Sequence, residues 1–321
     1  MQPFKKSFVR LFAAGIIILA FTRCNHFKKG EGDMFYKIVE NKGGDTIEEG
    51  DFTALTYSVR TEEGAVWYDS NDEDGRLAFK FRERPYFKGD LFSALGLLSE
   101  GDSAILRINI DSVVTRSGRP RPLTRGKYLI YTIRVNKVIA RGGSPDSLYN
   151  SRIEAFKTAE IERARLNETA KFDHYLSSKN IKATATASGL NYIVTKQGVG
   201  PRPSPGDNVK LDYTVTFLSG KVIETSVAET AKKAGIFNKL YPYGPHSFPV
   251  QMSSTLSGFQ EALLLFPKGT KVILIIPSRL AYGPNTYKNI QPYTSLLCEL
   301  EILDITHPNN RITKPNVPCE F

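Results

Sequence analysis

The sequence predicts an α+β protein of two similar units joined by a helical linker. With 321 residues the chain is long for one domain, so two domains are the natural expectation. Segments in which apolar and polar residues alternate are separated by turns rich in glycine, proline and aspartate, which is typical of antiparallel strands. One short apolar stretch of helical character interrupts the strands in each half, so each unit is expected to be α+β.

The first residues indicate an export signal. Residues 1–10 form a basic start, and residues 11–22 are an uncharged, largely apolar run. Such a run suits the core of a secretory signal and is short for a membrane span of about 20 residues. We therefore expect a signal peptide at 1–23, with a short N-terminal anchor as an alternative.

Cys24 stands where a bacterial lipoprotein carries its lipidated cysteine. The residues before it depart from the usual lipobox pattern, because Phe21 replaces a leucine and Arg23 replaces a small residue. If Cys24 is lipidated, residues 24–33 would be a tether to the bilayer. The protein would then lie in the bacterial cell envelope, at the outer membrane and facing the periplasm. The alternative is a signal peptide without lipidation.

The two halves of the chain echo each other. In each, a Gly-Asp pair precedes an alternating segment that leads to a tyrosine, Tyr57 or Tyr213. A short apolar helix, a turn at a glycine and further strands follow. The matching segments are 48–59 with 204–215, 94–110 with 262–278, and 128–139 with 296–305. We expect the units to span 34–140 and 184–306.

Residues 141–183 are expected to form the helical linker. Ser144 is a good N-cap and Pro145 a good first helical residue. Apolar residues then recur every three or four positions with charges between them, as in one helix or two. These apolar residues are Ile153, Phe156, Ile161, Ala164, Phe172, Tyr175 and Leu176. The linker would serve as a spacer or rigid arm, or as a dimerisation surface, and the tail at 307–321 should be irregular.

Charge and cysteine content exclude several classes of function. The formal net charge is +10, but four of the basic residues lie within 1–23 and the others are interspersed with acids. This pattern argues against nucleic-acid binding. Besides Cys24 only Cys298 and Cys319 remain, which is no disulfide framework, and the histidines and cysteines have no metal-ligand spacing. We expect no metal and no cofactor.

From Ser188 to residue 305, ordered motifs resemble the FKBP family of peptidyl-prolyl cis-trans isomerases. They read SGLNYIVTKQGVG, PGDNVKLDYTVTFLSGKVIETS, SGFQEALLLFPKGTKVILIIPSRLAYG and IQPYTSLLCELEILDI. The lead-in at 172–192 is similar to the macrophage-infectivity-potentiator branch, in which a helix precedes the isomerase domain. The resemblance implies an antiparallel sheet wrapped around one short helix, with a proline pocket between them.

The resemblance also implies the residues of that pocket. The family's catalytic positions fall on Tyr213, Phe248, Phe259 and Tyr282, and its substrate-binding positions on Ile223, Glu224, Leu256, Ile290 and Cys298. Tyr282 would donate a hydrogen bond to a substrate carbonyl beside the prolyl bond. At four positions the sequence departs from the family's usual residue: Ile223-Glu224 stand for Phe-Asp, Phe259 for Trp, and Cys298 for Phe. Residues 227–247 replace a much shorter connection.

The first half resembles the same family more weakly. Tyr57 and Tyr131 fall at pocket positions, but the floor position is Leu91, and Val114 stands where Tyr282 would be. Because valine cannot donate a hydrogen bond, we expect residues 34–140 to be a degenerate domain without catalysis.

Two functions follow as expectations. The first is an envelope isomerase and folding chaperone for exported proteins, with proline-containing polypeptides as clients and the bilayer as a partner through Cys24. The second is a non-catalytic interaction subunit of an envelope or outer-membrane protein assembly, which the insertion at 227–247 favours. Because the pocket has fewer aromatic walls than is usual in the family, contacts with the prolyl ring would be weaker and any isomerase activity would be low.

Overall fold

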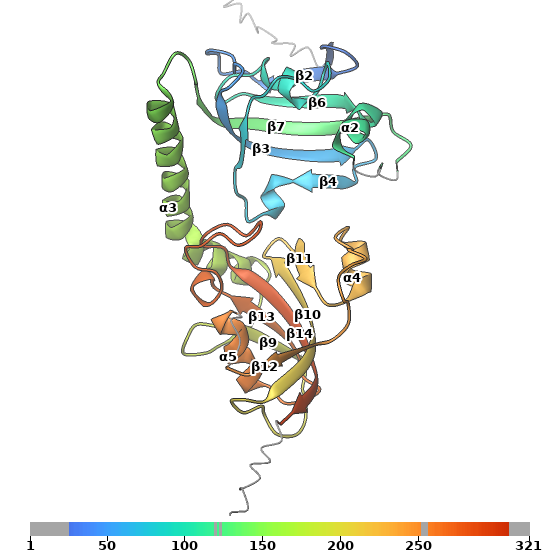
Figure 1. Ribbon diagram of the computed structural model, residues 1–321, viewed down its shortest axis with the longest axis vertical. Coiled ribbons are helices and arrows are strands. Elements are labelled where there is room, and N and C mark those ends of the chain that lie inside the picture. The colour runs from blue at the N-terminus through green and yellow to red at the C-terminus, as the bar shows by residue number, and fades with distance from the viewer. Residues whose placement is uncertain (1–25, 119–120, 122–123, 252–255, 308–321) are drawn as a thin grey trace, which may run out of the picture.

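The computed structural model describes residues 26–118, 121, 124–251 and 256–307. It has two antiparallel sheets, one above the other, with the long helix α3 running beside them (Figure 1). The expected α+β class is confirmed. The expected signal peptide, Cys24 and all of the tail beyond His307 lie outside the described residues.

The first sheet has the strand order β1-β2-β6-β7-β3-β4, and β5 also pairs with β3. Its strands are β1 (Lys28–Lys29), β2 (Phe35–Glu40), β3 (Phe52–Thr61), β4 (Val66–Asp69), β5 (Ala78–Phe81), β6 (Ser103–Asn109) and β7 (Tyr128–Ile139). Its helices are α1 (Leu91–Leu95), α2 (Ile110–Ser117) and the 3₁₀ turn η1 (Ser70–Asp72). The bounds of β7 coincide with the alternating segment expected at 128–139.

The sheet begins earlier than the sequence indicated. Lys28 and Lys29 pair with Tyr36 and Phe35, so two of the ten residues of the expected tether at 24–33 belong to the first sheet. The amide of Gly30 donates to the carbonyl of Met34 at 2.9 Å and closes the turn that folds these two lysines back. Two residues are too short a segment for an alternating pattern to reveal.

The second sheet repeats this topology with the order β11-β10-β14-β13-β9-β8, and β12 also pairs with β10. Its strands are β8 (Thr184–Ala185), β9 (Asn191–Lys196), β10 (Asn208–Phe217), β11 (Val222–Thr225), β12 (His246–Pro249), β13 (Lys271–Ile276) and β14 (Leu296–Thr306). The helices are α4 (Ala228–Lys233), α5 (Ser257–Leu265) and the 3₁₀ turn η2 (Ser278–Leu280).

The duplication extends to single hydrogen bonds. In the first sheet the amide of Tyr57 donates to Oγ of Ser70 at 3.0 Å, and in the second the amide of Tyr213 donates to Oγ of Ser226 at 3.0 Å. The two strand orders also match, so every strand of one sheet has a counterpart in the other, as the repeated segments predicted. Each sheet carries its own buried apolar cluster, because alternation places every second side chain of a strand on one face.

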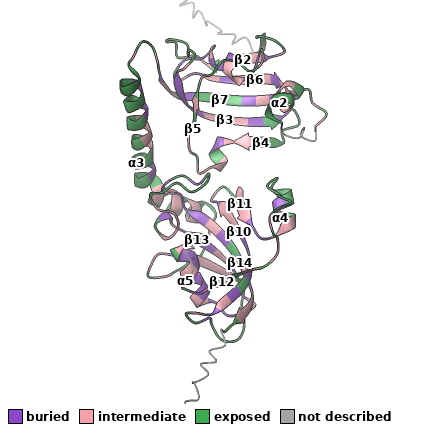
Figure 2. Cartoon of the chain, viewed as in Figure 1, coloured by how far each residue is buried: buried purple, intermediate pink, exposed green. Residues whose placement is uncertain are grey.

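Helix α3 (Asp146–Ser178) is a single helix of 33 residues. It begins one residue later than expected, because Pro145 has an extended ψ of 145° and takes the cap position itself. Most of its surface is exposed (Figure 2). Of the apolar residues expected to be covered, Ile161 is exposed, whereas Tyr149, which the spacing did not select, is buried.

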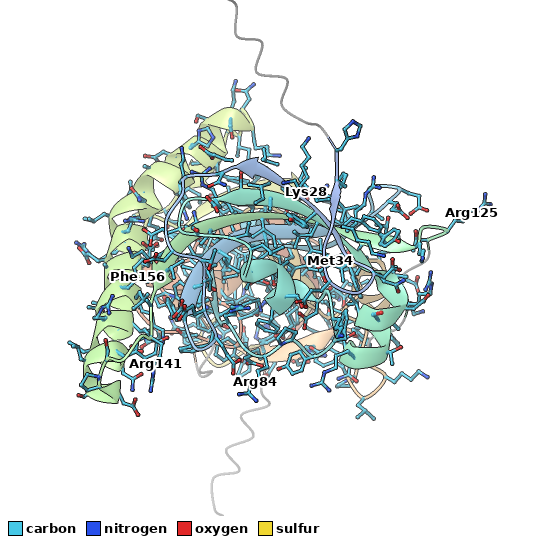
Figure 3. All side chains as sticks on the ribbon, turned by 90° about the horizontal axis from the view of Figure 1, so that it is seen from above. Lys28, Met34, Arg84, Arg125, Arg141 and Phe156 are labelled. Carbon is cyan, nitrogen blue, oxygen red and sulfur yellow. The ribbon has the colours of Figure 1, made fainter. Side chains whose placement is uncertain are left out.

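The N-terminal half of α3 packs on the first sheet. The hydroxyl of Tyr149 donates to the carbonyl of Gly50 at 2.6 Å, and Ile153 joins a buried cluster with Phe52. Phe156 lies on the side of the helix that faces this domain (Figure 3), in edge contact with the ring of Phe52 at 6.1 Å. The helix is thus anchored to the first domain before it reaches the second. Among the described residues, no helix is both long enough and apolar enough to span a membrane.

Candidate functional site

A cavity of about 360 Å³ lies in the second domain where β10, β11, β12 and β14 face α5 and the loop after η2. All nine residues named from the sequence line it. They are Tyr213, Ile223, Glu224, Phe248, Leu256, Phe259, Tyr282, Ile290 and Cys298. Five further lining residues were not anticipated: Val215, Ile276, Tyr287, Lys288 and Leu296.

Three aromatic rings form one end of the cavity. Tyr213 of β10 meets Phe248 of β12 edge-on with ring centroids 5.9 Å apart, and Phe248 meets Phe259 of α5 at 5.0 Å. Phe259 is the floor and is buried among the core residues of the domain. Edge-to-face packing holds such rings in defined orientations, so the apolar walls are fixed before a ligand arrives.

Cys298 of β14 forms a small, buried part of the wall. Burial raises the pKa of its thiol above the ordinary value, with the nearby Glu299 and Glu224 adding to the effect. The thiol is therefore neutral and acts as a small apolar group. A cysteine in this position leaves space that a larger side chain would fill.

The hydroxyl of Tyr213 is engaged within the protein. It donates to Oε1 of Glu224 at 2.7 Å and lies 2.9 Å from the hydroxyl of Tyr241. Because a hydroxyl carries one hydrogen, Tyr241 is the donor in the second bond. Burial, then the hydrogen bonds with Tyr241 and Glu224, raise the pKa of Tyr213. This side chain orients its neighbours, and its own hydrogen is already committed.

A cation lies beside the same carboxylate. Nζ of Lys288 is 3.2 Å from Oε2 of Glu224. Partial burial by itself would lower the pKa of Lys288, but the hydrogen bond and attraction to Glu224 leave that pKa raised. The charge of Glu224 is thus balanced at the edge of an otherwise apolar cavity.

Tyr282 differs from Tyr213 in one decisive respect. Among the described residues, no group forms a hydrogen bond with its hydroxyl. Its ring stacks on that of Tyr287, with centroids 4.4 Å apart and an interplanar angle of 9°. Burial, followed by the proximity of Tyr287 and Glu224, raises the pKa of Tyr282 to about 12. At neutral pH the hydroxyl is therefore a protonated donor available to a ligand.

The insertion at 227–247 contributes to the site through residues that sequence reasoning missed. Tyr241 reaches the hydroxyl of Tyr213, as described above, and also lies against Tyr243 at 4.9 Å. Tyr243 in turn stacks on Phe237 at 5.1 Å with an interplanar angle of 7°. The density of aromatic residues in this segment was the available signal, although only the fold shows that they meet β10.

In the first domain different side chains stand at the corresponding positions. Tyr131 lies at the position that Cys298 has in the second domain, and it is buried. Tyr57 packs against Tyr68 with ring centroids 4.7 Å apart. Val114 lies on helix α2, where the second domain has the Tyr282 loop, and packs against the buried core. This arrangement offers no tyrosine hydroxyl at the Val114 position.

The described part of the chain contains no group of three or more histidine, cysteine, aspartate or glutamate residues that could hold a metal ion. The arrangement can bind an apolar ring and offer a hydrogen bond from Tyr282.

Comparison with known proteins bears on the second domain. Residues 200–303 match the family described as FKBP-type peptidyl-prolyl cis-trans isomerase. An Escherichia coli protein named FKBP-type 22 kDa peptidyl-prolyl cis-trans isomerase is 35% identical over 130 residues, covering 40% of this chain and 56% of that protein. FkpA of Aeromonas hydrophila, named as an isomerase of the same type, is 29% identical over 162 residues, covering 50% of this chain and 55% of the relative.

A third relative is the outer membrane protein MIP of Legionella longbeachae, 29% identical over 162 residues, covering 50% of this chain and 63% of the relative. The chain thus spans between 55% and 63% of the length of these three relatives. The crystal structure of FkpA from Escherichia coli aligns with 51% of this chain and 75% of its own, at 25% identity and a TM-score of 0.39.

Proposed function

We propose that the chain isomerises X–Pro bonds in polypeptides, because residues 200–303 match the family described as FKBP-type peptidyl-prolyl cis-trans isomerase. Such a bond resists rotation because resonance gives it partial double-bond character, with a barrier of about 18–20 kcal/mol. Twisting the bond breaks the resonance and makes the imide less polar. A pocket that excludes water then stabilises the twisted form relative to the planar one.

The observation that carries this proposal is the hydroxyl of Tyr282 at an apolar cavity, which no residue in the described part of the chain engages in a hydrogen bond. We assign Phe248 and Phe259 to the walls that grip the prolyl ring, and Tyr282 to the donor that orients the flanking carbonyl. Tyr213, in edge contact with Phe248, and Glu224 complete the lining through their mutual hydrogen bond. The reaction makes and breaks no covalent bond, so it requires no nucleophile.

The clients would be exported, proline-containing polypeptides in the bacterial envelope. Support comes from the basic and apolar order of residues 1–22 before Cys24 and from the name of the Legionella relative, an outer membrane protein. We propose that Cys24 carries lipid and tethers the chain to the outer membrane, on the periplasmic side. A role as a folding chaperone for proteins in transit fits that location.

A second candidate is a non-catalytic interaction subunit of an envelope assembly. The specific observation in its favour is the insertion, in which Ile236 and Phe237 are exposed and Leu240 is 92% exposed. Exposed apolar residues that lie near one another are typical of contact surfaces. Both candidates use the same domain, and they differ in whether a bound prolyl bond is turned over.

A protease-coupled assay of the full chain on several Xaa-Pro peptides separates the two. The isomerase proposal requires an acceleration above the uncatalysed rate that is proportional to protein concentration. The matched control is Phe259→Ala, which removes the floor of the pocket. A folded wild-type chain that accelerates none of the peptides would refute the catalytic assignment and leave the interaction role.

A further inference from the structure

One carboxylate of the linker helix is hydrogen-bonded to the second domain. Oε1 of Glu168 accepts from the amide of Ser278 at 2.6 Å, and Oε2 accepts from the hydroxyl of the same serine at 2.6 Å. Oε1 also accepts from the hydroxyl of Ser295 at 3.1 Å. The two serines are only 2% and 4% exposed. Glu168 therefore makes three hydrogen bonds with groups that solvent barely reaches.

These two serines bracket the segment that carries the candidate donor. Ser278 opens η2, with one residue between it and the end of β13, and Ser295 directly precedes β14. Within the segment, the amide of Gly283 donates to the carbonyl of Ser278 at 2.8 Å, and the amide of Tyr293 donates to the carbonyl of Gly283 at 2.7 Å. Tyr282 thus sits in a loop whose start and end are tied to a single carboxylate.

The first domain reaches the same loop. The guanidinium of Arg76, located between η1 and β5, donates to the carbonyls of Pro292 and Tyr293. Asp74 lies 3.4 Å from Arg76 and 3.2 Å from Lys171, which is three residues beyond Glu168 on α3. Figure 1 shows the loop after β4 reaching toward the second domain at this point. The linker helix and the first domain therefore both contact the Tyr282 loop and restrain it.

The other side of the pocket has a similar contact. Nζ of Lys221 lies 2.6 Å from the carboxylate of Glu73, and the hydroxyl of Ser219 donates to the carbonyl of Asp72 at 2.8 Å. Lys221 directly precedes β11, the strand that presents Ile223 and Glu224 to the cavity. The first domain thus touches the chain on both flanks of the pocket.

We propose that Glu168 is a positioning residue, which holds the Tyr282 loop where its hydroxyl can reach a peptide bound in the cavity. Through Arg76, a first domain without a tyrosine at the donor position supports the site of the second. This inference rests on the proposed prolyl-peptide site. Its physical basis is that a donor must be held within a few tenths of an ångström of its productive position to favour a transition state.

The test uses the full chain with Glu168→Ala, and Glu154→Ala as the matched control. Glu154 is an exposed glutamate on the same helix that pairs with Lys157. Loss of the charged acceptor should lower kcat/KM for an Xaa-Pro peptide roughly 3- to 30-fold. Glu168→Gln, which keeps one acceptor oxygen, should lose less. Ser295→Ala, which removes one of the three hydrogen bonds, should lose the least, and Glu154→Ala should equal the wild type.

Hydrogen exchange supplies a readout independent of activity. In Glu168→Ala, peptides covering 278–295 should exchange faster, while peptides covering β10 should exchange as in the wild type. If exchange in 278–295 is unchanged, or if it rises with kcat/KM unaffected, the positioning role is wrong. Global unfolding of Glu168→Ala would also accelerate exchange in peptides covering β10. In that case Glu168→Gln and Ser295→Ala, measured in the same way, decide whether the positioning role is correct.

Failure of the proposed function is distinguishable from failure of this inference. A wild-type chain without isomerase activity would refute the catalytic proposal alone. Calorimetric titration with the same Xaa-Pro peptide would then test the inference, because a misplaced Tyr282 should bind the peptide more weakly in Glu168→Ala than in Glu154→Ala. Equal affinities in the two variants would overturn it.

Discussion

Tyr131 and Cys298 occupy the same position in the two sheets. Tyr131 is the partner of Val59 and Leu106, and Cys298 is the partner of their counterparts Val215 and Leu274. Both are buried. In the first domain the large ring belongs to the core, whereas in the second the small thiol borders a cavity. The two repeats thus differ in side-chain volume at this buried position.

Replacement of Cys298 by tyrosine should therefore fill the pocket. We expect Cys298→Tyr to abolish binding of Xaa-Pro peptides and to cost about 1–3 kcal/mol of stability from overpacking. Calorimetric titration with denaturant unfolding measures both effects. Cys298→Ala, which leaves the cavity open, is the control and should still bind. Equal binding by the tyrosine variant would show that the ligand sits elsewhere.

Removal of the Tyr282 hydroxyl should lower activity at constant stability. A net hydrogen bond contributes about 0.5–1.5 kcal/mol, so kcat/KM of Tyr282→Phe should fall roughly 2- to 13-fold. The melting temperature should not change, because no described group of the protein uses this hydroxyl. Tyr86→Phe, in the first domain, removes a hydroxyl far from the pocket and should leave activity intact. An unaltered kcat/KM in Tyr282→Phe would remove this residue from the mechanism.

The raised pKa of Tyr282 predicts its alkaline behaviour. Burial holds the hydroxyl protonated up to about pH 12, whereas the same group in the unfolded chain ionises near 10.0. The folded state therefore retains a proton that the unfolded state releases. The stability from this group is complete below about pH 10 and is lost as the pH rises toward 12.

Activity should follow the same ionisation. We expect kcat/KM to show no loss from Tyr282 ionisation between neutral pH and about pH 10. In an ultraviolet titration, the tyrosinate step missing from Tyr282→Phe should lie well above the ordinary tyrosine range. If the tyrosinate step that disappears in Tyr282→Phe lies near pH 10, the ring is solvated and the pocket does not exclude water.

Truncation of the pocket floor should cost both stability and activity. Phe259 is buried in the core, and removal of such a ring costs about 3–5 kcal/mol. We expect Phe259→Ala to lie near the lower end, because one side of the ring already faces the cavity. Phe259→Leu introduces the residue found at the matching position of the first domain and should cost less than about 1.5 kcal/mol. Denaturant unfolding and the peptide assay distinguish the two variants.

The mature chain should begin at Cys24 with an added acyl group. The prediction follows from the basic, apolar and cysteine order of residues 1–24. Intact-mass measurement of protein from the native membrane fraction checks it, with Cys24→Ser as the unmodified control. A mature mass that begins at another residue and carries no acyl group would contradict lipidation, and Arg23 would be the sequence feature responsible.

The sequence by itself determined the longer strands and their repetition in the two halves of the chain. Alternation of apolar and polar residues in 128–139 is a local property of the chain, because every second side chain of a strand must face the core. The bounds of β7 therefore agreed with it. The nine candidate site residues were also named from motifs, and the structure places all of them around one cavity, although their roles in catalysis stay predictions.

Only the tertiary structure decided which distant groups meet. Glu168 bonds Ser278 across 110 positions of sequence, and Tyr241 reaches Tyr213 across 28. No periodicity encodes such pairs, since they depend on which helix face and which loop lie opposite each other after folding. The exposure of Ile161 also depends on tertiary structure. Spacing places it among the apolar residues of α3, but a residue is buried only where another part of the chain covers it.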